Sequence, residues 1–204
     1  MSNLIIIGVS ALGRETYSHA RACGLTVKGF LDSRSGLLDR FPGYPPILSS
    51  VEDYSVSKED VFVCAVGDPG ERRRYVEMVA AKGGRFVSVV HPSAVLGMNA
   101  SIGAGCIIQP FAVVGNDASI GQHALIGPQS LVEHDCKAGD YATLSPGCHV
   151  AGWCTLGEGV FLGIHSAVIP HVNLGSGVFV AAGAVVVKSI GSGRVMGVPA
   201  KPVS

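Results

Sequence analysis

The sequence has few charged residues and no long apolar run. Aspartate, glutamate, lysine and arginine make up 15% of the 204 residues, and the 15 basic residues balance the 15 acidic ones. Because no run of like charge stands out, the composition does not indicate a nucleic-acid or membrane-surface partner. The longest apolar stretch, 179–187, has about half of the ~20 residues that a membrane-spanning helix needs.

The N-terminus lacks the features of a secretory signal. No basic residue precedes the apolar segment 4–7, and this segment is too short for the hydrophobic region of a signal peptide. We therefore expect a cytoplasmic protein with no membrane partner, in which the six cysteines are reduced.

Glycine, by contrast, is abundant, with 28 residues, and it punctuates two different patterns along the chain. Residues 1–89 alternate short apolar segments with longer segments that end in glycine. This order predicts strands and helices in turn, and hence an α/β domain with a parallel sheet and right-handed crossovers. The predicted strands are 4–7, 27–31, 61–66 and 85–90, and the predicted helices are 14–23 and 71–82.

From residue 90 onward the sequence repeats every six residues. An aliphatic residue, or alanine at 138, occupies every sixth position from Val90 to Val186, and a small residue usually follows four positions later. Each hexad is expected to form one short strand and one corner, with about 18 residues in a triangular coil. Seventeen hexads without an insertion predict an all-β parallel β-helix of between five and six coils over residues 90–204. Glycine often follows the aliphatic position, where we expect it to permit the turn.

Most cysteines and histidines fit this repeat without a special function. Four cysteines occupy its small position, namely Cys106, Cys136, Cys148 and Cys154. Cysteine packs there as a small hydrophobic residue. His123, His165 and His171 share another position of the hexad, but their spacing does not bring them together as zinc ligands, so we expect no metal. We expect these histidines and Trp153 on exposed faces of the β-helix.

One segment interrupts the apolar repeat with three ionisable residues, Glu133, His134 and Asp135. Such residues are costly in an apolar repeat unless they have partners or a task. A histidine suits acyl transfer as the general base that takes a proton from an attacking amine or hydroxyl, and Asp135 can hold its tautomer. Gly152 follows His134 by one coil, so its N–H could bind the developing oxyanion. The alternative is a solvated surface histidine.

Further motifs accompany this segment. The set comprises Glu133-His134-Asp135-Cys136, Gly139-Asp140, Phe161-Leu162-Gly163-Ile164 and Gly197-Val198-Pro199-Ala200-Lys201. With them, nearly the whole chain resembles the bacterial nucleotide-sugar acyltransferases of the hexapeptide-repeat superfamily. More narrowly, it resembles the UDP-4-amino-sugar N-acetyltransferases and their sialic-acid O-acetyltransferase-like relatives. This resemblance implies a left-handed β-helix, an N-terminal half-Rossmann domain and a homotrimer.

The resemblance also implies roles for individual residues. In the family a histidine is the general base and the following acid raises its basicity, which corresponds to His134 and Asp135. The donor is implied to be acetyl-CoA, a co-substrate in contact with Ile164 and Ala182. Thr143 stands where the family often has a second histidine near the acyl carbonyl, so we expect its hydroxyl to make that contact.

A glycine-rich turn, residues 8–13, follows the first predicted strand and opens a helix, and Asp32 ends the next strand. Dinucleotide-binding folds share this arrangement. A domain of residues 1–89 provides only one mononucleotide half, which favours a UDP-sugar over NAD. The resemblance implies a nucleotide-sugar site formed by Ser10, Ala11, Leu12, Asp32, Ser33 and Gly67. The family usually has Gly-His in place of Ala11-Leu12 and a second aspartate in place of Ser33.

These observations predict an acetyl-CoA-dependent acyltransferase of glycan biosynthesis that acts on a nucleotide-linked sugar. Two alternatives remain at this stage: a non-catalytic β-helix trimer that serves as a scaffold, and a zinc-dependent hydratase. The sequence leaves open the identity of the sugar, N- or O-acylation, and the length of the acyl chain.

Overall fold

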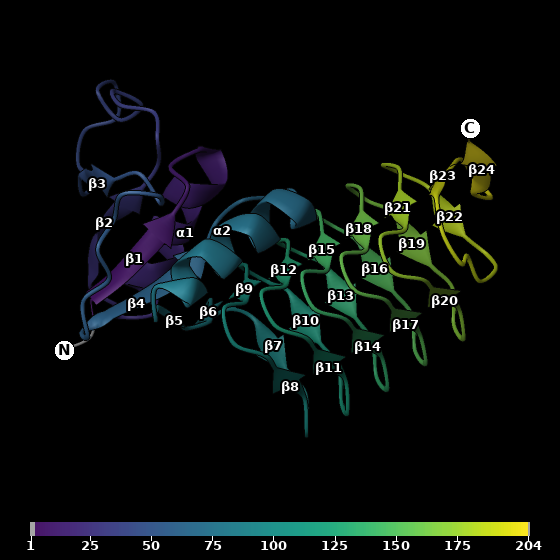
Figure 1. Ribbon diagram of the computed structural model, residues 1–204. Coiled ribbons are helices and arrows are strands. Elements are labelled where there is room, and N and C mark those ends of the chain that lie inside the picture. Colours follow the sequence, from purple (N-terminus) through teal and green to yellow (C-terminus); the bar gives the residue numbers. More distant parts are fainter. Residues whose placement is uncertain (1–2, 204) are drawn as a thin grey trace.

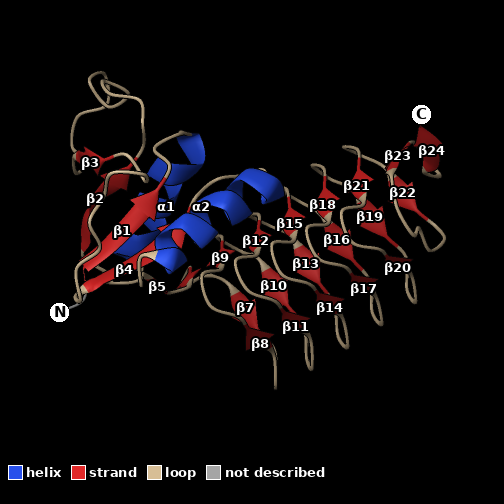
Figure 2. Ribbon diagram, in the orientation of Figure 1, coloured by secondary structure: helices blue, strands red, loops and turns tan. Residues whose placement is uncertain are grey.

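The computed structural model describes residues 3–203 and consists of an α/β domain from which a β-helix extends (Figure 1). Both helices lie in the N-terminal domain, and the β-helix is built from short strands joined by turns (Figure 2). This confirms the predicted fold class and the order of its two parts. Within residues 3–203 neither helix has the length and apolarity to cross a membrane.

The N-terminal domain contains a five-stranded parallel sheet with the order β3-β2-β1-β4-β5. Its elements are β1 (Asn3–Ile7), α1 (Ala11–Ala22), β2 (Val27–Leu31), β3 (Ile47–Ser49), β4 (Asp60–Cys64), α2 (Pro69–Ala81) and β5 (Arg85–Phe86). Alternate residues of β1 enter two cores: Leu4 and Ile6 pack on the α1 side, and Ile5 and Ile7 pack on the α2 side. Because both faces of the sheet are buried, the strand reads as an unbroken apolar run.

Three details of this domain differ from the predictions. The short strand β3 was not predicted, and the predicted strand 85–90 is divided into β5 and β6. Helix α1 begins at Ala11, before the predicted start at residue 14, and includes Gly13. A side chain at Gly13 would overlap the carbonyl oxygen of Gly8, so glycine allows α1 to pack closely on the turn after β1.

The β-helix confirms the six-residue repeat. Each strand from β6 to β22 covers two residues, and each strand from β6 to β19 pairs in parallel with the strand 18 residues later, as Val113 with Leu131 and Leu131 with His149. The strands are β6 (Val89–Val90), β7 (Val95–Leu96), β8 (Ser101–Ile102), β9 (Ile107–Ile108), β10 (Val113–Val114), β11 (Ser119–Ile120), β12 (Leu125–Ile126), β13 (Leu131–Val132), β14 (Lys137–Ala138), β15 (Thr143–Leu144), β16 (His149–Val150), β17 (Thr155–Leu156), β18 (Phe161–Leu162), β19 (Ala167–Val168), β20 (Asn173–Leu174), β21 (Phe179–Val180) and β22 (Val185–Val186). The predicted domain boundary at residue 90 falls within β6.

The three sheets of the β-helix form three faces with different outward side chains. The domain face, which carries the N-terminal domain, comprises β6, β9, β12, β15, β18 and β21, extended by β23 (Arg194–Met196) and β24 (Lys201–Val203). The apolar face comprises β7, β10, β13, β16, β19 and β22, with outward residues Val95, Val113, Leu131, His149, Ala167 and Val185. The polar face comprises β8, β11, β14, β17 and β20, with outward residues Ser101, Ser119, Lys137, Thr155 and Asn173.

The interior of the β-helix is filled by the second residue of each strand and by the small residue four positions later. The four cysteines of the small position are buried there, as predicted. Burial raises the pKa of the Cys106 and Cys136 thiols to about 11. Both therefore stay protonated near neutral pH, as expected of residues that pack rather than react.

The glycine after each aliphatic residue has a different role from the predicted one. The left-handed backbone conformation occurs two residues later, for example at Asp135 (φ 58°) and Trp153 (φ 64°). A Cβ atom on Gly115 would lie 2.6 Å from the His134 nitrogen, and one on Gly139 would lie 2.7 Å from the Glu158 nitrogen. These glycines therefore permit the close approach of neighbouring coils.

We expect Gly13→Ala to lower the free energy of unfolding of the protein by roughly 1–3 kcal/mol, as overpacking typically does. The added methyl group would push α1 away from the Gly8 carbonyl. Gly191→Ala is the control, because a Cβ atom there would meet nothing within 4 Å. Chemical denaturation of both variants measures the difference, and equal stabilities would contradict the packing argument.

Candidate functional site

His134 lies at the corner between the apolar and polar faces, in the turn that joins β13 to β14. Its Nδ1 atom is 2.9 Å from Oδ2 of Asp135, and its Nε2 atom is 3.9 Å from Oε2 of Glu133. The imidazole is half exposed. The corner therefore presents a histidine that is oriented by one carboxylate and open to solvent, the arrangement expected of a general base.

The neighbouring coil holds the His134 ring in place. A Cβ atom on Gly152 would lie 2.6 Å from Cε1 and 2.7 Å from Nε2 of His134, so the ring occupies the space that a side chain would need. Gly152 is buried beneath this ring and leaves room for the imidazole. The hydrogen bond expected from its N–H to a developing oxyanion stays a prediction.

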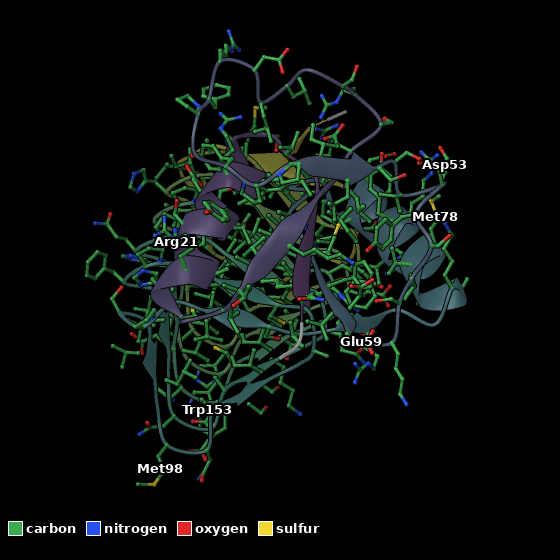
Figure 3. All side chains as sticks on the ribbon, turned by 90° about the vertical axis from the view of Figure 1, so that its left-hand side faces the viewer. Arg21, Asp53, Glu59, Met78, Met98 and Trp153 are labelled. Carbon is green, nitrogen blue, oxygen red and sulfur yellow. The ribbon has the colours of Figure 1, made fainter. Side chains whose placement is uncertain are left out.

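Aromatic rings continue along the same corner. Trp153 contacts His134 edge-on, with ring centroids 6.1 Å apart, and stacks on His171 at 6.3 Å. Figure 3 shows Trp153 at the edge of the coil that lies far from Arg21 and the N-terminal domain. The indole is half exposed, as expected of a residue on the surface of the β-helix.

A second site is the cavity of about 280 Å³ at the carboxyl ends of β1, β2 and β4. Its lining includes four of the residues predicted to bind the nucleotide sugar: Ser10, Asp32, Ser33 and Gly67. The other two predicted residues do not line it. Ala11 is the exposed first residue of α1, and Leu12 packs against the core on the α1 side.

Asp32 is the central charged group of this cavity. Arg34 donates two side-chain hydrogen bonds to it, both at 2.9 Å, and the backbone N–H groups of Arg34 and Val9 donate two more, at 3.1 and 3.2 Å. Burial alone would raise the pKa of Asp32, but these hydrogen bonds outweigh it and hold the pKa below its usual value. The ionised carboxylate can therefore accept hydrogen bonds from ligand hydroxyls at neutral pH.

The turn that leads into α1 adjoins Asp32 and lines the cavity with Gly8 and Ser10. Ser10 is the N-cap residue, but its side chain makes no capping hydrogen bond, and the first turn carries no acidic residue. The helix dipole and the free N–H groups of this turn favour an anion such as a phosphate. A hydroxyl-binding acid and an anion-binding helix end together suit a nucleotide.

Among the cavity residues that the sequence did not identify are four with polar or charged side chains: Arg34, Glu52, Glu71 and Tyr75. Arg34 stands two residues after Asp32, and its charge next to an expected binding acid is a signal that could have found it. Glu71 and Tyr75 come from α2, four residues apart and thus on one side of the helix. Only the packing of α2 on the sheet brings them to the cavity.

The residues predicted to contact acetyl-CoA lie in different places. Ile164 and Ala182 are exposed on successive coils at the corner between the domain and apolar faces. A trough of about 310 Å³ lies on the apolar face, and its lining includes Ala167, His149 and Glu133, the residue before His134. Thr143 is buried beneath the N-terminal domain, where it accepts a hydrogen bond from Arg72 and donates one to the Gly67 carbonyl.

His123 was expected on an exposed face, and this expectation is wrong. Its side chain is buried beneath the N-terminal domain, stacked on Tyr141 at 5.2 Å and edge-on to Phe86 at 4.8 Å. The three histidines that share a hexad position, His123, His165 and His171, lie at three different corners of the coil. Residues 3–203 contain no group of three potential metal ligands.

The cavity and His134 lie on opposite sides of the molecule. The N-terminal domain packs on the domain face, through contacts with residues such as Ile107 and Leu125. His134 lies at the corner between the other two faces. A ligand in the cavity of one chain therefore cannot reach His134 of the same chain without passing around the coil.

Comparisons with known proteins agree with this geometry. Residues 3–79 match the PglD N-terminal domain. The acetyltransferase domain of PglB from Neisseria gonorrhoeae is 30% identical to this chain, with full coverage of both chains and a TM-score of 0.92. PerB from Caulobacter crescentus, solved in complex with CoA and GDP-perosamine, is 29% identical over 100% of this chain and 98% of that chain, with a TM-score of 0.91. No curated protein matches the sequence.

The match to the Neisseria domain covers both the N-terminal domain and the β-helix, so this relative shares the architecture of the whole chain. The β-helix is accordingly the left-handed form predicted from the resemblance. The chain belongs to the nucleotide-sugar acetyltransferases of the hexapeptide-repeat superfamily.

Proposed function

We propose that this protein transfers the acetyl group of acetyl-CoA to the amino group of a nucleotide-linked sugar. The observation that carries this proposal is the His134–Asp135 pair, held at 2.9 Å on a solvent-open corner beside the apolar trough. The Neisseria domain has been solved with acetyl coenzyme A, and the Caulobacter enzyme is a perosamine N-acetyltransferase. Both relatives support acetyl-CoA as the donor and an amine as the acceptor, ahead of a hydroxyl.

The hydrogen-bond pattern of His134 supports a catalytic step in which the imidazole is the general base. Nδ1–H donates to Asp135, which leaves the lone pair of Nε2 directed away from that carboxylate. The amine attacks the thioester carbonyl, and Nε2 takes the proton that the amine loses as the carbon–nitrogen bond forms. The carbon–sulfur bond then breaks, and the leaving CoA thiolate takes up the proton from Nε2, which returns the imidazole to its neutral form. Asp135 stabilises the imidazolium that exists between these two events.

The N-terminal cavity is proposed to bind the nucleotide part of the acceptor. Asp32 would accept hydrogen bonds from the ribose hydroxyls, and the amino end of α1 with Ser10 would bind the diphosphate. Ser33 and Gly67 line the same cavity and would contact the nucleoside and the sugar. Ala11 and Leu12 would contribute through the first turn of α1.

The acyl donor is proposed to lie along the apolar face. Ile164 and Ala182 would contact CoA at one edge of this face, and His134 lies at the other edge. Because the cavity of one chain faces away from its own His134, the acceptor would reach the His134 of a neighbouring subunit. A homotrimer with a threefold axis brings three such pairs together.

Removal of the imidazole should abolish most of the activity. We expect His134→Ala to lower kcat by roughly 10²- to 10⁴-fold, the usual contribution of a general base, with little change in KM for acetyl-CoA. Asp135→Asn should cost less, because the base stays in place. Steady-state kinetics on an accepted nucleotide amino sugar give both values. A His134→Ala enzyme with near wild-type kcat would rule out the mechanism.

Gly152 offers a test of the geometry around the base. A methyl group at this position would collide with the His134 ring, so we expect Gly152→Ala to lower kcat by roughly 10²-fold, a loss typical of a misplaced catalytic group. The stability should change little if the exposed ring simply swings outward. Gly191→Ala is again the matched control, and equal kcat values in the two variants would show that the ring position is unimportant.

The oligomeric state is measurable directly. Light scattering at micromolar concentration should give three times the chain mass of 20.9 kDa. The apolar face should be the contact surface, so Leu131→Glu should shift the protein towards monomers, because a buried unpaired carboxylate destabilises an interface. Lys137→Glu on the polar face is the control. A monomeric wild-type protein with full activity would exclude the shared site.

A further inference from the structure

Arg72, in the first turn of α2, is the largest fully buried side chain, with 1% of its surface exposed. Burial lowers the pKa of its guanidinium, but an arginine stays protonated in proteins. Within residues 3–203 no carboxylate forms an ion pair with Arg72. A buried charge without a counter-ion is strongly unfavourable unless hydrogen bonds satisfy it.

The guanidinium is satisfied entirely by neutral oxygens. Nε donates to the His123 carbonyl at 2.8 Å. Nη1 donates to the carbonyls of Val66 at 2.7 Å and Gly67 at 3.0 Å. Nη2 donates to the Tyr141 carbonyl at 2.6 Å and to Oγ1 of Thr143 at 2.7 Å. These contacts use all five N–H groups, in a fork that the single ammonium of lysine cannot reproduce.

The acceptors of Arg72 come from two parts of the molecule. Val66 and Gly67 follow β4 and line the nucleotide cavity. The other acceptors belong to successive coils of the β-helix, beside β12 and β15, along which α2 lies (Figure 1). Thr143 completes the junction, because its hydroxyl also donates to the Gly67 carbonyl at 3.3 Å. Gly67 is therefore held from two directions.

We propose that Arg72 is a positioning residue, which holds the Gly67 rim of the nucleotide-sugar cavity in a fixed register with the β-helix. The inference rests on the proposed function. In this arrangement Thr143 is the β-helix side chain that bonds to both Arg72 and Gly67. The acyl-carbonyl contact predicted for Thr143 would require its hydroxyl to leave the Arg72 network. A fixed rim would hold every bound acceptor sugar at the same position along the axis of the β-helix. The sugar amine would then always lie at the coil where the acyl group is transferred.

The neighbouring residue provides a matched control. Arg73 forms an ion pair with Glu158, which also joins α2 to the β-helix. The two side chains are 40% and 47% exposed, and the hydrogen bonds to the Gly67 carbonyl come from Arg72 and Thr143 instead. If Arg72 acted only by attaching the two domains, loss of either arginine should affect the protein in the same way.

Calorimetric titration with UDP, GDP and CoA tests the proposal on the full chain, with Arg72→Lys, Thr143→Val, Thr143→Ser and Arg73→Met. We expect Arg72→Lys and Thr143→Val to weaken binding of the preferred nucleotide by roughly 10-fold or more, as loss of a hydrogen bond to a charged group does. CoA affinity should stay unchanged in both. Thr143→Ser should restore nucleotide binding, and Arg73→Met should bind all three ligands like the wild type.

The outcomes distinguish failure of the proposed nucleotide-sugar acceptor from failure of the positioning role of Arg72. A wild-type protein that binds neither UDP nor GDP contradicts the proposed nucleotide-sugar acceptor itself. Wild-type nucleotide affinity in Thr143→Val overturns the positioning role, and this variant decides the matter if Arg72→Lys fails to fold. Weaker CoA binding in Thr143→Val would also overturn it, in favour of the acyl-carbonyl contact.

Discussion

Successive coils of the β-helix stack through parallel pairing of residues 18 apart, and this contact leaves almost no space between them. Val113 pairs with Leu131, and Leu131 pairs with His149. A Cβ atom on the glycine after most strands would meet the backbone of the next coil, as at Gly115. Each inner position of the repeat therefore accepts side chains of one size only, either large aliphatic or small. Polar and charged side chains that could act in function are confined to the outward positions and the corners.

The His134 corner shows how a histidine and a carboxylate are accommodated within this restriction. Asp135 takes the left-handed conformation of the corner, and its carboxylate meets Nδ1 of the preceding residue. The imidazole then lies over the next coil, which is possible only because Gly152 has no side chain. The imidazole, the carboxylate that orients it and the space for the ring thus come from two coils, whose spacing the strand pairing sets.

The three faces of the β-helix differ in what their outward side chains contact. The domain face is covered by the N-terminal domain, and its outward residues Ile107 and Leu125 belong to that domain's core. The polar face carries short polar side chains and lysine, which are well solvated. The apolar face lies between the His134 corner and the corner with Ile164. Its apolar character suits contact with a second subunit and with the donor, since burial of apolar surface favours association.

Local pattern was sufficient to predict much of this protein. The six-residue period determined the β-helix and the burial of Cys106 and its equivalents, because each position of the repeat meets the same neighbours in every coil. The His134–Asp135 pair was predictable for a related reason: the two residues are adjacent in sequence and need no distant contact to meet. Asp32 was predictable as a residue of the nucleotide-sugar site in the same way, because it directly follows a predicted strand.

Only the tertiary structure determined which residues of the N-terminal domain and of the β-helix contact each other. Arg72 reaches Thr143, 71 residues away, and His123, 51 residues away, and no local periodicity encodes such contacts. The burial of His123 and the commitment of the Thr143 hydroxyl both follow from the N-terminal domain covering one face. That the cavity faces away from His134 is likewise a property of how α2 docks, because docking depends on the fit of two complete surfaces and not on any single segment.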